Sequence, residues 1–334
     1  MNRFTKYTPG IAAAAAMTAL ILDSQTAIQA AAQAIEICVK TAIPSLFPFF
    51  VLSGILVPYA SHLRLPFLRK LLKLPDGWES IFLLGWLGGY PVGAQCIAQG
   101  YSSGKLDREQ AQRMLGFCTN CGPSFLFGIV GCALGSSKQA LAVMLTGIIS
   151  AIIVGMLWPC REQKNAENPQ IPSVSLPQAV RQALRSMASV CAWIILGKVL
   201  LAFLTRWFLW RLSDELQLIT TGMLELTNGC LMLRQCANED LRFAAACAMT
   251  SFGGLCVAMQ VRSLCADTGL EDRLYLPQKL LQSAAASILA LGHIAMPGFL
   301  WIIGAVLIGI PILCKKTVEI PKTLVYNGGN KGGR

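Results

Sequence analysis

The chain has 334 residues, of which 54% are hydrophobic and only 13% are charged, and its formal net charge is +11. Charged residues make up about 25% of a soluble domain, so this composition excludes an ordinary soluble protein and predicts an all-α polytopic membrane protein. The basic residues gather in short clusters between apolar runs, for example from Arg64 to Lys73. Such clusters are typical of charges beside membrane helices, and no basic stretch with interleaved aromatic residues indicates a nucleic-acid partner.

The first segment, residues 1–27, is an N-terminal anchor or signal-like segment. Arg3 and Lys6 precede an apolar stretch from Ile11 to Leu22, and small residues follow. This shape fits a secretory signal peptide and a first membrane anchor equally well. Because the rest of the chain is membrane-embedded, we favour an anchor that is not cleaved.

The remaining sequence divides into two halves of similar organisation. A polar linker with three prolines separates them, and the end of the chain is polar and rich in glycine, which predicts disorder. We expect a first structural repeat at residues 28–160, a linker at 161–180, a second repeat at 181–314 and a disordered tail at 315–334. The 35 uncharged residues from Leu280 to Cys314 are too many for one crossing, and Pro297 with Gly298 predicts a division of this run into two.

The stretch from Ser80 to Gly104 contains 25 residues without a charge. Its length would suit one membrane helix, but Gly88, Gly89 and Pro91 interrupt its middle. Backbone groups freed by such an interruption need partners, so the break is tolerable only inside protein or beside a wet cavity. The stretch therefore predicts a broken or re-entrant hairpin.

The same pattern returns 165 residues later. Laying residues 88–115 on 253–280 without a gap gives eight identities in 28 positions, where ordinary composition would give about two. Two broken hydrophobic segments at corresponding places in two halves indicate the binding site of a transporter. The identities include Gly88, Gly89 and Gln95, which match Gly253, Gly254 and Gln260.

The relative orientation of the repeats depends on the number of crossings. About three full crossings in each half would invert the second repeat relative to the first, and we favour this topology. The segment from Leu216 to Leu233 is expected to form a short interfacial or half-inserted helix. If it instead crosses fully, the repeats become parallel. Both arrangements stay open at this point.

A solute site is expected where the two broken segments meet. Glycine N–H groups at half-helix ends would favour an anion, and polar side chains would complete the lining. Structural hydrogen bonds between helices and close helix packing are the alternative roles of these glutamines and glycines. The predicted substrate-binding residues are Gly88, Gly89, Pro91, Gln95, Thr119, Asn120, Ser124, Asn228, Ser251, Gly253, Gly254 and Gln260.

Few residues indicate metal binding or catalysis. Cys118 and Cys121 form a C-x-x-C pair, but a zinc site needs four ligands and the chain has only two histidines. An enzyme would need a nucleophile and base such as one of these cysteines with His293, and we predict neither enzyme activity, metal nor cofactor. The candidates for proton coupling are Glu36, Lys40 and Glu225, although Glu36 and Lys40 also suit a simple pair on one helix face.

Four motifs carry a family resemblance: Pro44 to Phe50, Gly89 to Ala94, Asn120 to Ser124, and Ser251 to Gly254 together with Gln260. In these, over residues 28–314, the chain resembles the sporulation integral membrane proteins of the YlbJ type, which carry a Gate, or nucleoside-recognition, domain.

The resemblance implies a multipass protein of an endospore-forming bacterium, related to the gates of nucleoside transporters and ferrous-iron permeases. It further implies movement of dipicolinate across the outer forespore membrane. The expected partners are membrane lipids, the solute, and other sporulation membrane proteins or a second copy of the chain. The alternative is a scaffold or regulator of spore-envelope assembly that transports nothing.

Overall fold

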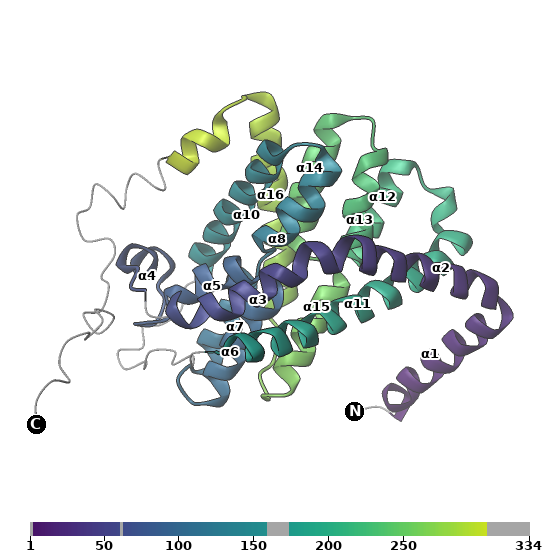
Figure 1. Ribbon diagram of the computed structural model, residues 1–334, viewed down its shortest axis with the longest axis horizontal. Coiled ribbons are helices and arrows are strands. Elements are labelled where there is room, and N and C mark those ends of the chain that lie inside the picture. Colours follow the sequence, from purple (N-terminus) through teal and green to yellow (C-terminus); the bar gives the residue numbers. More distant parts are fainter. Residues whose placement is uncertain (1–2, 61–62, 159–173, 306–334) are drawn as a thin grey trace, which may run out of the picture.

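The computed structural model describes residues 3–60, 63–158 and 174–305 (Figure 1). Helices make up nearly all of the regular structure in these ranges, which confirms the all-α prediction. The predicted tail and most of the predicted linker lie outside the described residues. Helix α11 begins at Leu176, inside the range assigned to the linker, because Ser175 and Gln178 form a capping box at its start.

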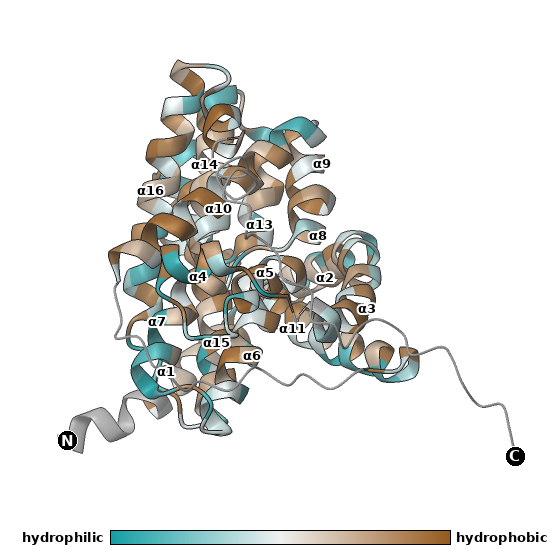
Figure 2. Cartoon of the chain, turned by 90° about the vertical axis from the view of Figure 1, so that its left-hand side faces the viewer, coloured by the Kyte–Doolittle hydropathy of each residue, from teal (hydrophilic) through white to brown (hydrophobic). Residues whose placement is uncertain are grey.

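Two long helices pack side by side at one edge of the molecule (Figures 1 and 2). They run antiparallel: the Ala179 side chain lies near Gly54, and Arg206 Nε lies 3.2 Å from Asp23 Oδ2. Much of their apolar surface is exposed to the surroundings, as expected for helices that face lipid. The first consists of α2 (Ser24–Ile37), a π-helical turn (Cys38–Ala42) and α3 (Ile43–Ala60), and the second is α11 (Leu176–Trp207).

The N-terminal helix α1 (Arg3–Leu22) covers most of the predicted anchor segment. Its described apolar part, Ala13–Leu22, is shorter than the helices that could cross a membrane. The prediction of an uncleaved anchor stays a prediction.

The first predicted break is present, and the chain reverses there. Helix α5 (Ser80–Gly88) ends at Gly89, whose φ of 76° lies in the left-handed region, and α6 (Tyr90–Ser102) begins directly after it. The two arms pack against each other, since a methyl group on Gly93 would lie 3.2 Å from the Gly85 Cα. This segment is a helical hairpin, and its re-entrance into a membrane stays a prediction.

A second hairpin occurs in a segment predicted only as interfacial or half-inserted. Helix α12 (Asp214–Leu224) turns at Glu225 into α13 (Leu226–Met232). The arms again touch through glycines, because a methyl group on Gly229 would overlap the Gly222 Cα. Glycines seven positions apart lie roughly 10 Å apart along a continuous helix, so this contact requires a reversal.

Two further segments are broken without reversing. In the first, α7 (Arg108–Cys118) is followed by four non-helical residues before the helix resumes at Pro123. In the second, α14 (Glu239–Phe252) and α15 (Leu255–Ala266) are separated by Gly253 and Gly254, with φ of 90° and 85°. The first broken span continues as α8 (Pro123–Phe125), a π-helical turn (Leu126–Val130) and α9 (Gly131–Leu134).

The remaining elements complete a bundle around these segments. Helices α10 (Ser137–Leu157) and α16 (Tyr275–Ala295) pack against each other and against α7 and α14. Beyond α16 the chain bends by 116° into a helix at Phe299–Ala305, which confirms the predicted division near Pro297. Smaller elements are α4 (Pro66–Leu72) and 3₁₀ turns at Leu209–Arg211 and Leu233–Gln235.

Within the described residues, five helices are long and apolar enough to cross a membrane, and the bent segment at α16 makes six. Hydrophobic residues predominate along the bundle helices α10, α14 and α16, while hydrophilic segments gather mainly at the two ends of the bundle (Figure 2). The chain is a multipass membrane protein. Along the chain, each half contains a long outer helix, a helical hairpin, a broken span and a further span.

The alignment made from the sequence places the α5–α6 hairpin on α14–α15, which is a broken span, so the two aligned segments differ in structure. The two structural repeats stay a prediction. The shared glycines mark breaks in both segments. They do not mark equivalent elements.

Candidate functional site

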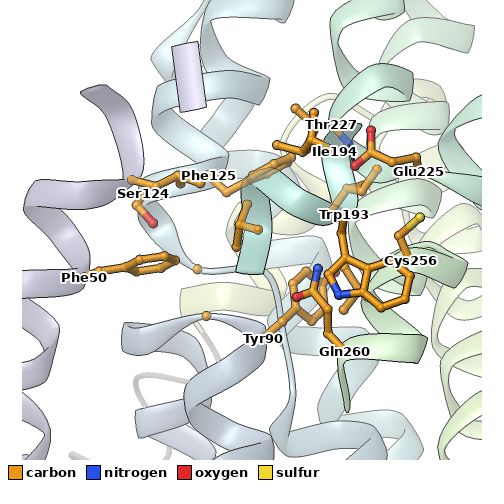
Figure 3. A pocket seen from close by; sticks show the side chains of 16 residues that line it. Phe50, Tyr90, Ser124, Phe125, Trp193, Ile194, Glu225, Thr227, Cys256 and Gln260 are labelled. Carbon is orange, nitrogen blue, oxygen red and sulfur yellow. Dashed lines mark hydrogen bonds between the residues drawn. The ribbon is translucent and has the colours of Figure 1, made fainter. Parts of the chain in front are cut away.

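Both hairpin tips and both broken spans line one cavity of about 70 Å³ (Figure 3). Trp193 and Gln260 lie together at one side of it, with Phe50 opposite. We call this space the inner cavity. The tips and breaks contribute Gly89, Tyr90, Gly122, Ser124, Glu225, Thr227, Cys256 and Gln260, while α3 and α11 contribute apolar side chains.

Glycines allow the tips to approach the breaks closely. A methyl group on Gly122 would lie 3.1 Å from the Gly89 Cα, and one on Gly253 would lie 3.0 Å from the Tyr90 ring. At the second tip, a methyl group on Gly254 would lie 3.2 Å from the Leu226 backbone nitrogen. The first tip therefore touches both breaks, and the second tip touches the break in α14–α15.

A larger outer cavity of about 380 Å³ adjoins the inner one and shares Phe50, Val190, Trp193 and Gln260 with it. Its lining is more polar. Among the described residues that line it, Arg185 is the only charged one. Its further polar side chains include Gln95, Gln182 and Ser263.

Glu225 forms the second hairpin tip and is almost fully buried. Its carboxylate accepts hydrogen bonds from Thr227 N at 3.0 Å, from Asn228 N at 2.6 Å and from Asn228 Nδ2 at 2.6 Å. A carboxylate at a helix start is stabilised by the free backbone N–H groups there. Predicted site residue Asn228 therefore holds Glu225.

Thr119 and Asn120, also predicted as site residues, occupy the break between α7 and α8 and face the buried Lys279. The Lys279 ammonium donates to Thr119 O at 2.6 Å, to Gln282 Oε1 at 2.8 Å and to Asn120 Oδ1 at 3.4 Å. Gln282 Nε2 in turn donates to Asn120 Oδ1 at 2.9 Å. These side chains form a polar network behind the first hairpin tip.

Lys279 is not among the residues predicted from the sequence. It directly precedes the uncharged run from Leu280 to Cys314, so its charge marks the boundary of that run. Helix α16 begins at Tyr275, so Lys279 lies inside the helix with no exposed surface. A lone basic residue beside so long an apolar run was the available signal, because ionisable residues within membrane helices are rare and usually functional.

Tyr90 was also missed. Its hydroxyl donates to Thr250 O at 2.5 Å, and its ring centroid lies 5.5 Å from Lys279 Nζ. One side chain thus links the first hairpin tip, the second broken span and the buried lysine. Its position directly after Gly89 at the predicted tip was the signal.

The other predicted site residues fall in three groups. Gly89, Ser124 and Gln260 line the inner cavity, while Gln95 and Gln260 line the outer one. Gly253 and Gly254 lie against the two hairpin tips. Three predicted residues have other positions: Gly88 packs against Val92, Pro91 lies in the first turn of α6, and buried Ser251 has a hydroxyl without a hydrogen-bond partner in the described part of the chain.

The remaining chemical candidates lie apart from the cavities. Cys118 and Cys121 are buried beside the α7 break, and His293 packs against the Phe243 ring with centroids 5.5 Å apart. On α2 and the following π-helical turn, Lys40 Nζ lies 2.7 Å from Glu36 Oε1, and both side chains are exposed, which confirms that they pair. Their role in proton coupling stays a prediction.

Comparison with known proteins finds the sporulation integral membrane protein YlbJ of Bacillus subtilis (strain 168). The two are 23% identical over 326 aligned residues, which cover 81% of this chain and 79% of that protein. No family model matches the chain, so the Gate domain stays a prediction, and no solved structure matches it. The chain is a multipass membrane protein and a distant homologue of a sporulation integral membrane protein.

Proposed function

We propose that the chain is a carrier or gated pathway for a small anionic metabolite, built from two inverted repeats. Each half has three candidate crossings, an odd number that would invert the second half relative to the first. The antiparallel packing of α3 on α11, which hold corresponding places in the two halves, supports this arrangement.

The observation that carries the proposal is the convergence of two re-entrant tips and two helix breaks on one cavity. Non-helical backbone at membrane depth is tolerated where it is buried in protein or lines a cavity, and discontinuous helices form the solute sites of many transporters. Four such interruptions around one space, next to a larger polar cavity, suit a solute path.

The charge of the lining favours an anion. Helix α15 begins at the inner cavity, where the free N–H groups of a helix start attract negative charge. Arg185 adds a positive side chain in the outer cavity. The one carboxylate at the inner cavity, Glu225, is already held by Thr227 and Asn228.

Dipicolinate is the first candidate solute. It is a flat dianion, and the cavities offer aromatic faces in Phe50 and Trp193 together with hydrogen-bond donors in Gln95 and Gln260. The homologous protein is a sporulation protein by name, and spore maturation is the process implied by the sequence resemblance. We propose the forespore membrane as the site of action, with lipids and other sporulation membrane proteins as partners.

Uptake by purified protein in liposomes tests the proposal. We expect dipicolinate accumulation above that of empty liposomes, and a reduction of about tenfold in Gln260→Ala, since a hydrogen bond to a charged group contributes roughly 1.5–3 kcal/mol. Gln95→Ala should reduce uptake as well. Gln99→Ala is the matched control, because Gln99 is exposed on the same helix and does not line either cavity. No uptake by the wild type, or full uptake by both variants, would refute the proposal.

A second candidate is a membrane scaffold that transports nothing. The broad exposed apolar surface of the two long outer helices favours it, because a partner protein or a second copy could cover this surface in place of lipid. A scaffold would show no uptake in liposomes while the gene remained necessary for spore-envelope assembly. We propose no catalytic role, since Cys118 and Cys121 are buried away from both cavities.

A further inference from the structure

Lys279 is enclosed by oxygen atoms at the C-terminal end of a broken helix. Its ammonium has three oxygen neighbours: the Thr119 carbonyl at 2.6 Å, the Gln282 amide at 2.8 Å and the Asn120 amide at 3.4 Å. The Tyr90 ring adds a π-face at 5.5 Å. The side chain has no exposed surface.

The charge of this ammonium has no ionic partner. In the described part of the chain no carboxylate oxygen lies within 4.0 Å of Lys279 Nζ. The acidic side chains buried in that part are held elsewhere: Glu79 accepts from Leu65 N at 3.3 Å, and Glu225 accepts from the start of α13. The positive charge is therefore balanced by dipoles, among them the negative end of α7.

The amides around Lys279 are oriented so that their oxygens face it. Asn120 Nδ2 donates to Phe117 O at 2.7 Å, which leaves Asn120 Oδ1 free to accept. Gln282 Nε2 donates to Asn120 Oδ1 at 2.9 Å and to Gly147 O at 3.4 Å, which leaves Gln282 Oε1 to the ammonium. The shell is thus built from groups in the break after α7 and from Gln282 on α16, while Gly147 O on α10 helps to orient the Gln282 amide.

An oxygen shell of this kind is a general device for holding monovalent cations. In secondary carriers, carbonyls of unwound backbone and the C-terminal ends of half-helices coordinate the coupling Na⁺. We infer that the Lys279 ammonium is a tethered cation that permanently fills such a site at the α7 break, so that no sodium ion binds there. The inference concerns a cation site and does not depend on the identity of the solute.

Thermal unfolding of the purified full-length protein tests this inference. The Lys279→Ala variant removes the three outer methylenes and the ammonium, which together correspond to propylammonium. At equal ionic strength, we expect the wild-type Tm to be the same in sodium chloride and choline chloride. The Tm of Lys279→Ala should be roughly 5 °C lower in choline chloride, and sodium or propylammonium should restore at least about half of that loss because each can enter the vacated shell.

Two further variants complete the design. Lys138→Ala removes an exposed lysine at the start of α10 and should leave the Tm unchanged in all three salts. Lys279→Met keeps the volume but leaves no room for a cation, so its Tm should be low and insensitive to the salt. It also serves if Lys279→Ala does not fold. A specific rise of the wild-type Tm in sodium, an Ala variant that neither cation restores, or a Met variant that responds to them would overturn the inference.

Discussion

The segments α5–α6 and α14–α15 share their glycines, a valine and a glutamine at aligned positions, yet one reverses and the other continues across the bundle. The two segments differ in the residues on either side of the break. The hairpin arms meet at Gly85 and Gly93, whereas the corresponding positions of α14–α15 are Thr250 and Ala258.

The other hairpin follows the same rule. Its arms, α12 and α13, meet at Gly222 and Gly229, although its tip has a glutamate where the first has a glycine. Glycine at the tip ends a helix, but glycines on both arms decide whether the chain can fold back, since a side chain there would keep the backbones apart.

The largest expected effect comes from an arm of the first hairpin. In Gly85→Ala the new methyl group would overlap the Cys118 carbonyl oxygen, which is backbone and cannot rotate away. We expect the free energy of unfolding to fall by about 3 kcal/mol or more, measured as a large loss of Tm. Gly10→Ala is the control, because a methyl group there meets no atom within 4 Å. Equal Tm values for the two variants would show that this arm needs no close contact with the end of α7.

A smaller effect is expected at the break that does not reverse. Gly253→Ala combines a left-handed φ of 90° with a methyl group 3.0 Å from the Tyr90 ring, and we expect a loss of about 1–3 kcal/mol in denaturation experiments. Gly269→Ala is a matched control, since Gly269 has a φ of 71° and open space around it. The difference between the two variants measures the packing of the first tip on the second broken span. If the two losses are equal, that packing contributes nothing.

The contribution of the second hairpin tip to stability can be tested separately, because the Glu225 carboxylate caps the helix that starts there. Glu225→Gln replaces one oxygen acceptor by an amide donor, so one of the three N–H groups from Thr227 and Asn228 loses its partner. We expect a loss of about 1–2 kcal/mol in the free energy of unfolding. Glu215→Gln, at an exposed position at the start of α12, should change it little. An unchanged stability for Glu225→Gln would mean that the cap is dispensable.

The smallest expected effect concerns the contact between the two segments compared above. Tyr90→Phe removes the hydrogen bond to Thr250 O while keeping the ring beside Lys279, and should lower the free energy of unfolding by about 1 kcal/mol. Tyr59→Phe, at an exposed position on α3, is the control. A loss as large as that of Gly85→Ala would indicate that this bond, and not the glycine contacts, fixes the first tip.

Local signals in the sequence show where the helices are interrupted, but they do not show which segments pack against each interruption. Gly89, Gly253, Gly254 and Pro297 could be found because glycine and proline act on the backbone where they stand. The ungapped match aligns a hairpin with a broken span, since similar helix-ending residues serve both. The tip at Glu225 lacks a glycine, so its sequence predicts only an interfacial or half-inserted helix.

The sequence by itself determined that this is a helical membrane protein with helices interrupted at Gly89 and at Gly253 and Gly254, since apolar length and backbone freedom are properties of consecutive residues. Only the tertiary structure decided which interruption reverses, that both tips meet at one cavity, and that Lys279 is enclosed by Thr119, Asn120 and Gln282. Those features depend on contacts between residues as far as 160 positions apart, which no local pattern encodes.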